Sequence, residues 1–190
     1  MKKILSLLAV LLVTVTVYAQ KVLVSDPAHS RIEFAVMHLG INDITGNFDK
    51  ASLTINADET SFVNSKINFQ VEPSSINTHI EARDNHLKSA DFFNVETYPT
   101  MVFNSTSLKK QKKNYYKLYG NLLMHGVTKP VELTLIYRGS TVNPMSKKTT
   151  HGYQVLGTLK RSDFGVGPNF PEAIISDLVR IKGDFELTEK

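Results

Sequence analysis

The residues best suited to chemistry in this chain gather in one segment, residues 78–93, with the sequence THIEARDNHLKSADFF. It contains two imidazoles, His79 and His86, beside Arg83 and Asp84. These residue types could bind a metal, transfer a proton or bind an anion. The histidines are seven residues apart, which is two helical turns rather than the single turn that lets two imidazoles bind one ion. Asp84 and His86 are two residues apart and point to different sides of a helix. The segment therefore predicts neither a shared metal nor a catalytic relay.

The rest of the chain has no stronger catalytic signature. It contains no HExxH motif and no GxSxG elbow, and the GVGP stretch at 165–168 lacks the Lys-Ser/Thr ending of a phosphate loop. Cysteine is absent, which removes thiolate ligands, disulfides and a lipobox cysteine. We predict that the protein is not an enzyme, and we assign no catalytic residue, metal ligand or cofactor. A zinc site assembled from distant strands stays open to metal analysis of the purified protein.

The segment at 78–93 is predicted to be a short helical insert. Thr78 and Glu81 have capping-box spacing, in which the threonine oxygen accepts from a first-turn N–H and the glutamate reaches back to the cap. Ile80 and Leu87 fall at helical intervals and give the helix one apolar stripe.

Most of the remaining sequence alternates between apolar and polar residues with the period of a β-strand. The alternation recurs in eight or nine runs, and turn residues such as Asp26-Pro27, His125-Gly126 and Asn143-Pro144 separate them. The connections are mostly too short for crossover helices, so neighbouring strands should pair antiparallel. Because closure removes exposed edges, we predict a mainly all-β fold, an eight-stranded antiparallel barrel.

Some of these runs are apolar on both faces of the strand. Leu39 follows the alternation of residues 32–36 on its opposite face, and Leu123 lies between Leu122 and Met124. Two interpretations are open: the helix or a partner chain, including a second copy in a homodimer, covers the outer face, or these are ordinary exposed apolar residues.

The N-terminus has the features of an export signal. Lys2 and Lys3 precede an apolar stretch at 4–17, and Ala19 satisfies the small-residue rule for cleavage. We predict a signal peptide at 1–19, cleaved after Ala19, and one domain at 20–190. The alternative, an uncleaved anchor, requires roughly 20 apolar residues, which this stretch does not reach. Loss of the two lysines lowers the formal charge from +4 to +2, so no nucleic-acid partner is predicted.

Four lysines, at positions 109, 110, 112 and 113, form the one local concentration of charge. They are predicted to occupy a solvated hairpin tip, with docking to an anionic surface as the alternative. A steep salt dependence of binding to anionic vesicles would favour that alternative.

An ordered set of motifs resembles the YceI family of lipid- or polyisoprenoid-binding proteins, from about residue 21 to residue 187. The resemblance implies a lipocalin-like barrel with a helical insert near its mouth, a periplasmic location, and an elongated apolar cavity for a polyisoprenoid chain. The motifs that carry it are the RDNHLKSADFF core of the helical segment, DPAHSRIEF at 26–34, GNF at 46–48, Tyr98-Pro99, Phe103 with Ser105, GNL at 120–122, HGVT at 125–128 and RSDFG at 161–165.

Candidate ligand contacts follow from the predicted inward faces and from the helix. The predicted lining residues are Phe34, Val36, Ile67, Phe69, Met101, Phe103, Leu133 and Leu135, with Phe164 and Phe170 near an opening. Arg83, His86 and Arg161 are the candidates for a polar or phosphate-bearing head group. For Arg83, an ion pair with Asp84 that clamps the helix to the barrel is an equally open interpretation.

Two functions of different classes remain at this point. The first is a periplasmic carrier or sequestering protein for a polyisoprenoid or similar amphiphile, of the quinone or prenyl-phosphate type, without a stable membrane anchor after cleavage. The second is a stress-related interaction module whose barrel is filled by its own side chains and holds no ligand.

Overall fold

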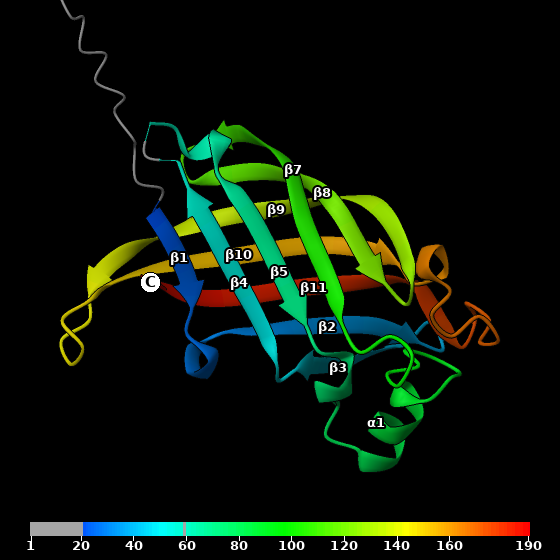
Figure 1. The fold of residues 1–190 in the computed structure, drawn as a ribbon. Helices are drawn as coiled ribbons and strands as arrows, with labels where there is room; N and C mark the ends of the chain where they lie inside the picture. Colours follow the sequence, from blue (N-terminus) through cyan, green and yellow to red (C-terminus); the bar gives the residue numbers. More distant parts are fainter. Residues whose placement is uncertain (1–20, 59) are drawn as a thin grey trace, which may run out of the picture.

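The computed structural model describes residues 21–58 and 60–190. The predicted signal peptide lies outside the described residues. The described chain is almost entirely β-structure, with a single α-helix (Figure 1). The strands are β1 (Lys21–Ser25), β2 (Arg31–His38), β3 (Asn42–Phe48), β4 (Ala51–Ala57), β5 (Lys66–Val71), β6 (Ile76–Asn77), β7 (Met101–Lys112), β8 (Tyr115–Met124), β9 (Val127–Val142), β10 (Thr149–Lys160) and β11 (Ile175–Glu189). The helix is α1 (Glu81–Lys88), and four 3-10 turns cover Pro27–His29, Phe62–Asn64, Pro73–Ser75 and Ser162–Phe164.

Eight of the strands close into an antiparallel barrel. The hydrogen-bonded order is β1-β4-β5-β7-β8-β9-β10-β11, and β1 also pairs with β11, which completes the ring. The predicted fold class is therefore confirmed. The lysine-rich turn is shorter than predicted, because β7 and β8 stay paired up to Lys112 and Tyr115.

The remaining three strands branch from the ring at β11. One end of β11 pairs with β1 at residues 187–189, and the rest pairs with β2 between residues 175 and 184. The chain breaks between β1 and β2 at Pro27, whose ring removes a donor, and the Asp26 carboxylate accepts from the Ala28 N–H at 2.9 Å. β2 continues into β3, and β6 pairs with β3 only at Asn47 and Phe48. The barrel wall is therefore split at one end.

The helix is shorter than the predicted insert and is not capped as predicted. Its N-cap is Ile80, which makes no side-chain cap hydrogen bond, and the helix ends at Lys88. The capping-box prediction for Thr78 and Glu81 is wrong because the Thr78 side chain is already bonded to Asp84, and His79 between them has a positive φ of 62°. The chain therefore turns sharply before the helix begins.

The two ends of the barrel differ in how they are filled. At the end that contains β1, a cluster of buried side chains closes the interior, and an aromatic group of Phe62, Tyr116, Tyr137 and Tyr153 stands at its outer limit. Burial raises the pKa of the Tyr153 hydroxyl, as expected for a phenol inside a packed core. A second buried cluster, which includes Phe48 and Phe92, lies at the split end. That second cluster leaves space beside it.

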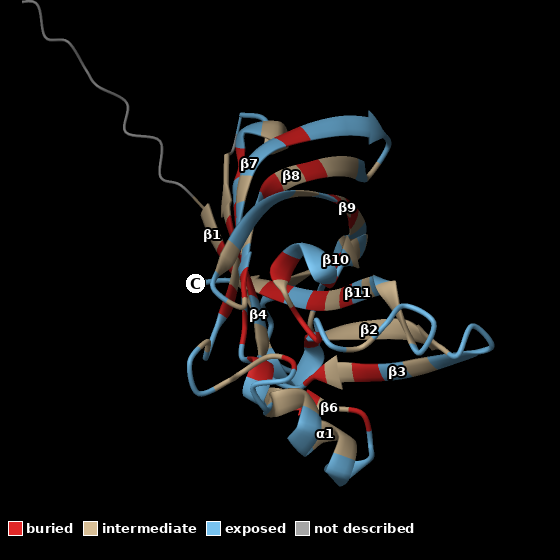
Figure 2. Ribbon diagram, turned by 90° about the vertical axis from the view of Figure 1, so that its right-hand side faces the viewer, coloured by how far each residue is buried: buried red, intermediate tan, exposed pale blue. Residues whose placement is uncertain are grey.

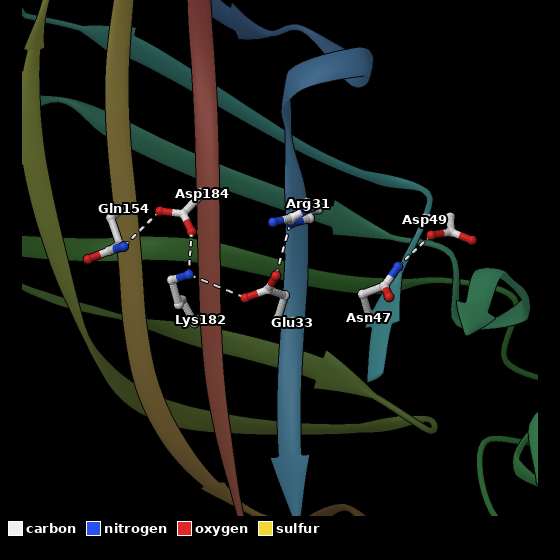
Figure 3. Close-up of polar contacts among 7 residues, drawn as sticks. All are labelled: Arg31, Glu33, Asn47, Asp49, Gln154, Lys182 and Asp184. Atoms are coloured by element: carbon white, nitrogen blue, oxygen red, sulfur yellow. Dashed lines mark hydrogen bonds and ion pairs between the residues drawn. The ribbon is translucent and has the colours of Figure 1, made fainter. Parts of the chain in front are cut away.

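A row of polar side chains crosses the outer face of β10, β11 and β2 (Figure 3). Gln154 donates to Asp184 at 2.7 Å, and Lys182 contacts Asp184 at 2.8 Å and Glu33 at 3.3 Å. Partial burial alone would raise the pKa of Asp184, but the hydrogen bonds from Lys182 and Gln154 outweigh it and leave that pKa lowered. This outer face is polar. Of the residues predicted to make strands apolar on both faces, Leu123 of β8 is exposed, whereas Leu39 lies in the turn after β2, where it is also exposed.

Asp184→Asn keeps the acceptor for Gln154 but removes the charge, and it should lower the free energy of unfolding near pH 7 by up to about 1 kcal/mol. Because folding lowers the pKa of Asp184, the contribution is present above the pKa of an unfolded aspartate, about 4, and is lost as the pH falls below it. The free energies of unfolding of the two proteins, measured with urea at a series of pH values, should therefore converge toward about pH 3. A difference that stays constant with pH would contradict this account of Asp184.

Candidate ligand-binding cavity

A cavity of about 400 Å³ occupies the split end of the barrel. Its wall is formed by inward side chains of the barrel strands together with β2, β3, α1 and the two loops at 89–100 and 161–174. The lining is almost wholly apolar, and the volume falls within the range of about 300–1,000 Å³ that is usual for small-molecule sites. Among the lining residues the polar or charged ones are His38, Thr78, Arg83, His86 and Arg161.

Most of the residues predicted from the sequence to line a cavity do so. The structure places Phe34, Val36, Phe69, Met101, Phe103, Leu133 and Phe170 on its wall. Ile67, Leu135 and Phe164 are not among the lining residues, so their predicted place on the cavity wall is wrong. Ile67 and Leu135 point inward but belong to the packed cluster at the closed end, and Phe164 is 1% exposed within the second cluster. Alternation shows which face a residue occupies but not its depth along the barrel.

Sequence reasoning missed several lining residues. Val179 and Ile181 of β11 carry the same alternation as the predicted residues and could have been included on that signal. Phe92 and Phe93 follow the helix in the segment at 78–93, and both rings face the cavity. His38, at the end of β2, had no distinguishing sequence signal.

Arg161 has a structural role that excludes its predicted contact with a head group. It is 9% exposed, and all five of its N–H donors are used by backbone carbonyls. The loop between β10 and β11 is thereby fixed around one side chain, and no donor is left for a ligand. Nε donates to Ser176 at 3.2 Å, Nη1 to Val166 at 3.1 Å and Gly167 at 2.6 Å, and Nη2 to Phe170 at 2.5 Å and Ile175 at 3.0 Å.

Gly167 allows this loop to pass close to the other wall of the cavity. Its φ is 62°, in the left-handed region that favours glycine, and a Cβ there would lie 2.7 Å from a ring atom of Phe92. Phe92 in turn stacks on Phe170 with ring centroids 4.7 Å apart. The loop and the segment after α1 therefore meet across the mouth.

Arg83 and Asp84 are joined through Thr78 rather than directly. Arg83 donates from Nε to the Thr78 hydroxyl at 2.8 Å and from Nη2 to the Thr78 carbonyl at 2.9 Å. The Asp84 carboxylate accepts from the Thr78 N–H at 2.8 Å and from the same hydroxyl at 2.5 Å. This clamp, made of Thr78, Arg83 and Asp84, fastens α1 to the residue that directly follows β6. The direct ion pair considered from the sequence is replaced by these bonds.

The clamp leaves part of Arg83 available to a ligand. Its hydrogen bonds engage Nε and Nη2 but not Nη1. In the described part of the chain, every buried polar side-chain atom has a hydrogen-bond partner. Since Nη1 has none, it is not buried and is accessible. Arg83 lies on the cavity wall, whereas Asp84 faces a separate polar hollow on the outer side of α1. The two halves of the clamp can therefore be tested separately.

His86 bridges the helix and the loop at the mouth. Its Nε2 lies 3.0 Å from an Asp91 oxygen, and its ring packs edge-on against Phe92 and Phe170, with centroids 5.1 and 5.6 Å away. Arg83 and His86 are thus the polar side chains of the sequence-predicted set that lie on the wall and retain free donor or acceptor capacity.

Within residues 21–58 and 60–190, no three His, Asp or Glu side chains come together as metal ligands would. In the same ranges, the helices are too short or too polar for any of them to cross a bilayer.

A closed eight-stranded antiparallel barrel with an apolar cavity at its split end places the chain among the lipocalin-like barrels. Its family follows from comparison with known proteins: residues 23–187 match the YceI-like domain, and the chain belongs to the YceI family.

Individual relatives agree with this assignment. A UPF0312 protein of Staphylococcus aureus is 35% identical over 149 residues, which cover 78% of this chain and 83% of that protein. The crystal structure of a Campylobacter jejuni YceI protein is 31% identical, with a TM-score of 0.72 and coverage of 81% of this chain and 90% of that one. A polyisoprenoid binding domain from Saccharophagus degradans, implicated in plant cell wall breakdown, shares the fold at 15% identity, with a TM-score of 0.66 and coverage of 90% and 100%.

Arg161→Lys should lower the free energy of unfolding by about 2–4 kcal/mol, because an ammonium has three donors and leaves at least two buried carbonyls without a partner. Arg180→Lys, the same change at an exposed residue with one ion pair to Asp43, should cost less than about 1 kcal/mol. Denaturant unfolding of both variants measures the difference. Equal losses would show that Arg161 does not hold the loop.

Proposed function

We propose that this protein binds a polyisoprenoid or a similarly shaped amphiphilic lipid, of the quinone or prenyl-phosphate type, and acts as a carrier or sequestering protein rather than an enzyme. The observation that carries the proposal is the apolar cavity within an otherwise closed barrel. The family and the polyisoprenoid-binding name of the Saccharophagus degradans domain support lipid binding in general. The alternative interaction module requires a self-packed interior, and only the closed end of this barrel is self-packed.

The apolar wall should supply most of the affinity. At about 0.8 kcal/mol per buried CH₂, one five-carbon isoprene unit contributes very roughly 3–4 kcal/mol before association costs. A charge-assisted contact to a head group contributes about 1.5–3 kcal/mol. Two isoprene units therefore outweigh the head group, whose contacts should mainly set the orientation of the ligand.

The head group should lie beside α1. Arg83 offers Nη1, and His86 offers the ring nitrogen that does not face Asp91. Arg161 is left out of this role because backbone carbonyls use all of its donors. A phosphate or a quinone oxygen at Arg83 would point the prenyl chain toward the aromatic wall formed by Phe69 and Phe103.

The proposed site of action is the periplasm. The basic and apolar N-terminus supports export with cleavage after Ala19, and the absence of cysteine supports release without a lipid anchor. There the protein would carry an insoluble lipid through an aqueous compartment.

Val179→Phe places a larger side chain on the cavity wall and should weaken binding of a prenyl alcohol at least about tenfold, because the added ring competes for the same space. Leu178→Phe is the matched control, because the neighbouring side chain is 50% exposed and is not among the lining residues. Displacement of a fluorescent prenyl probe measures both. Equal affinities for the two variants would place the ligand outside the cavity.

Arg83→Ala should weaken binding of a prenyl phosphate by about tenfold or more while changing affinity for the matching prenyl alcohol much less, because only the phosphate uses the guanidinium. Asp84→Ala breaks the other half of the clamp and should lower the melting temperature without this selectivity. If both variants destabilise the protein and neither discriminates between the two ligands, Arg83 serves only the clamp.

A further inference from the structure

Three large apolar side chains stand in solvent at the mouth of the cavity. Leu39 and Ile41 occupy the turn between β2 and β3, where they are 54% and 84% exposed, and Ile174, in the loop before β11, is 42% exposed. Figure 2 shows β2 and β3 running side by side to one edge of the molecule, with α1 below them. We refer to Leu39, Ile41 and Ile174 as the mouth rim.

The mouth rim is continuous with the cavity wall. The Leu39 N–H donates to the Ile174 carbonyl at 3.0 Å, which holds the turn against the loop. His38 and Ile175, the chain neighbours of these two residues, pair with each other and line the cavity. A lipid leaving the cavity between them would meet an apolar edge.

The backbone of the turn gives a second, independent observation. Leu39 and Gly40 have φ values of 52° and 70°, and the Ile41 N–H donates to the His38 carbonyl at 3.1 Å, the arrangement of a type I′ turn. Such turns favour Asn-Gly, and a leucine in the left-handed region is disfavoured. Among the described non-glycine residues with positive φ, the others are His, Asn or Lys. Leu39 is therefore unfavourable for the turn and unfavourable in water.

We propose that the mouth rim inserts into the interfacial region of a phospholipid bilayer, so that the cavity opens toward the membrane while lipid is loaded or released. The proposal rests on the proposed function for the nature of the cargo. Transfer of exposed apolar side chains from water to the boundary between head groups and acyl chains lowers the free energy. A bilayer is a suitable partner because the mouth rim and the cavity behind the mouth rim are both apolar.

The charges near the mouth rim favour apolar insertion over electrostatic attraction. Arg180, on the outer face of β11, is paired with Asp43 of β3. The lysine-rich hairpin is remote, because β7 runs from Met101 at the cavity to Lys112 at the opposite end of the barrel (Figure 1). Docking through the mouth rim should therefore require neither anionic lipid nor low salt.

The test is flotation of the purified protein with phosphatidylcholine vesicles at low and high salt. Ile41→Asp should lower the partition coefficient at least about tenfold with little change in melting temperature, because the side chain is exposed. Leu39→Asn should also lower binding, yet it should raise the melting temperature by about 2–4 °C because it creates the favoured Asn-Gly turn. If Leu39 served only folding, its substitution would not lower vesicle binding while raising the melting temperature.

Two controls use the opposite end of the barrel. Met145→Asp changes a side chain that is 91% exposed in the loop between β9 and β10, and replacement of Lys109, Lys110, Lys112 and Lys113 by glutamine removes the charged hairpin. Neither should alter binding to neutral vesicles.

Three results would overturn the proposal. One is unchanged flotation of Ile41→Asp. Another is flotation that requires anionic lipid and disappears in the lysine variant. The third is a dimer that Ile41→Asp dissociates, without vesicle binding by either form. Binding of a short prenyl alcohol in the absence of vesicles tests the cavity separately. If the wild-type protein does not bind this alcohol, the proposed function is refuted. Vesicle flotation would still decide the role of the mouth rim.

Discussion

The structure depends on the way β11 divides its hydrogen bonds. One edge of β11 pairs continuously with β10, whereas the other edge serves β1 near its end and β2 along the rest. The division is encoded locally, because Pro27 and the Asp26 carboxylate interrupt what would otherwise be one strand. Strands β1 and β4 then close the ring at one end, while β2 and β3 lead away from it at the other. A barrel that closes at one end and divides at the other can be packed and hollow in the same molecule.

The polar groups at the split end mainly replace the strand contacts that are lost there. Arg161 joins three carbonyls of the loop before β11 to two carbonyls at the start of β11, and the clamp of Thr78, Arg83 and Asp84 ties α1 to the residue that follows the short strand β6. Aromatic contacts of His86 and Phe92 with Phe170 join these two pieces across the mouth. Once these requirements are met, few polar atoms remain to face a ligand. The cavity therefore presents an almost wholly apolar wall with a limited number of polar groups.

The sequence predicted the parts of this account that follow from periodicity. Alternation identified the inward faces of β2, β5, β7 and β9, and it correctly turned Ile67 and Leu135 toward the interior. Alternation could not show that Ile67 and Leu135 lie in the packed half of the barrel. The position of a residue along the barrel axis depends on the stagger of the strands and on which strands meet at each end. Arg161 was identified as important but given the wrong role, since the carbonyls it binds are brought together only by the folded loop. The capping box failed for a similar reason: Thr78 has a closer partner in Asp84.

The proposed occupant of the space at the split end of the barrel is the chain of an isoprenoid lipid. Native mass spectrometry of the protein purified from its native host, followed by organic extraction and identification of the released compound, tests this most directly. We expect one prenyl lipid per chain, which is lost on extraction and regained when prenyl chains are added. A protein that is recovered empty and takes up no added prenyl chain would contradict it.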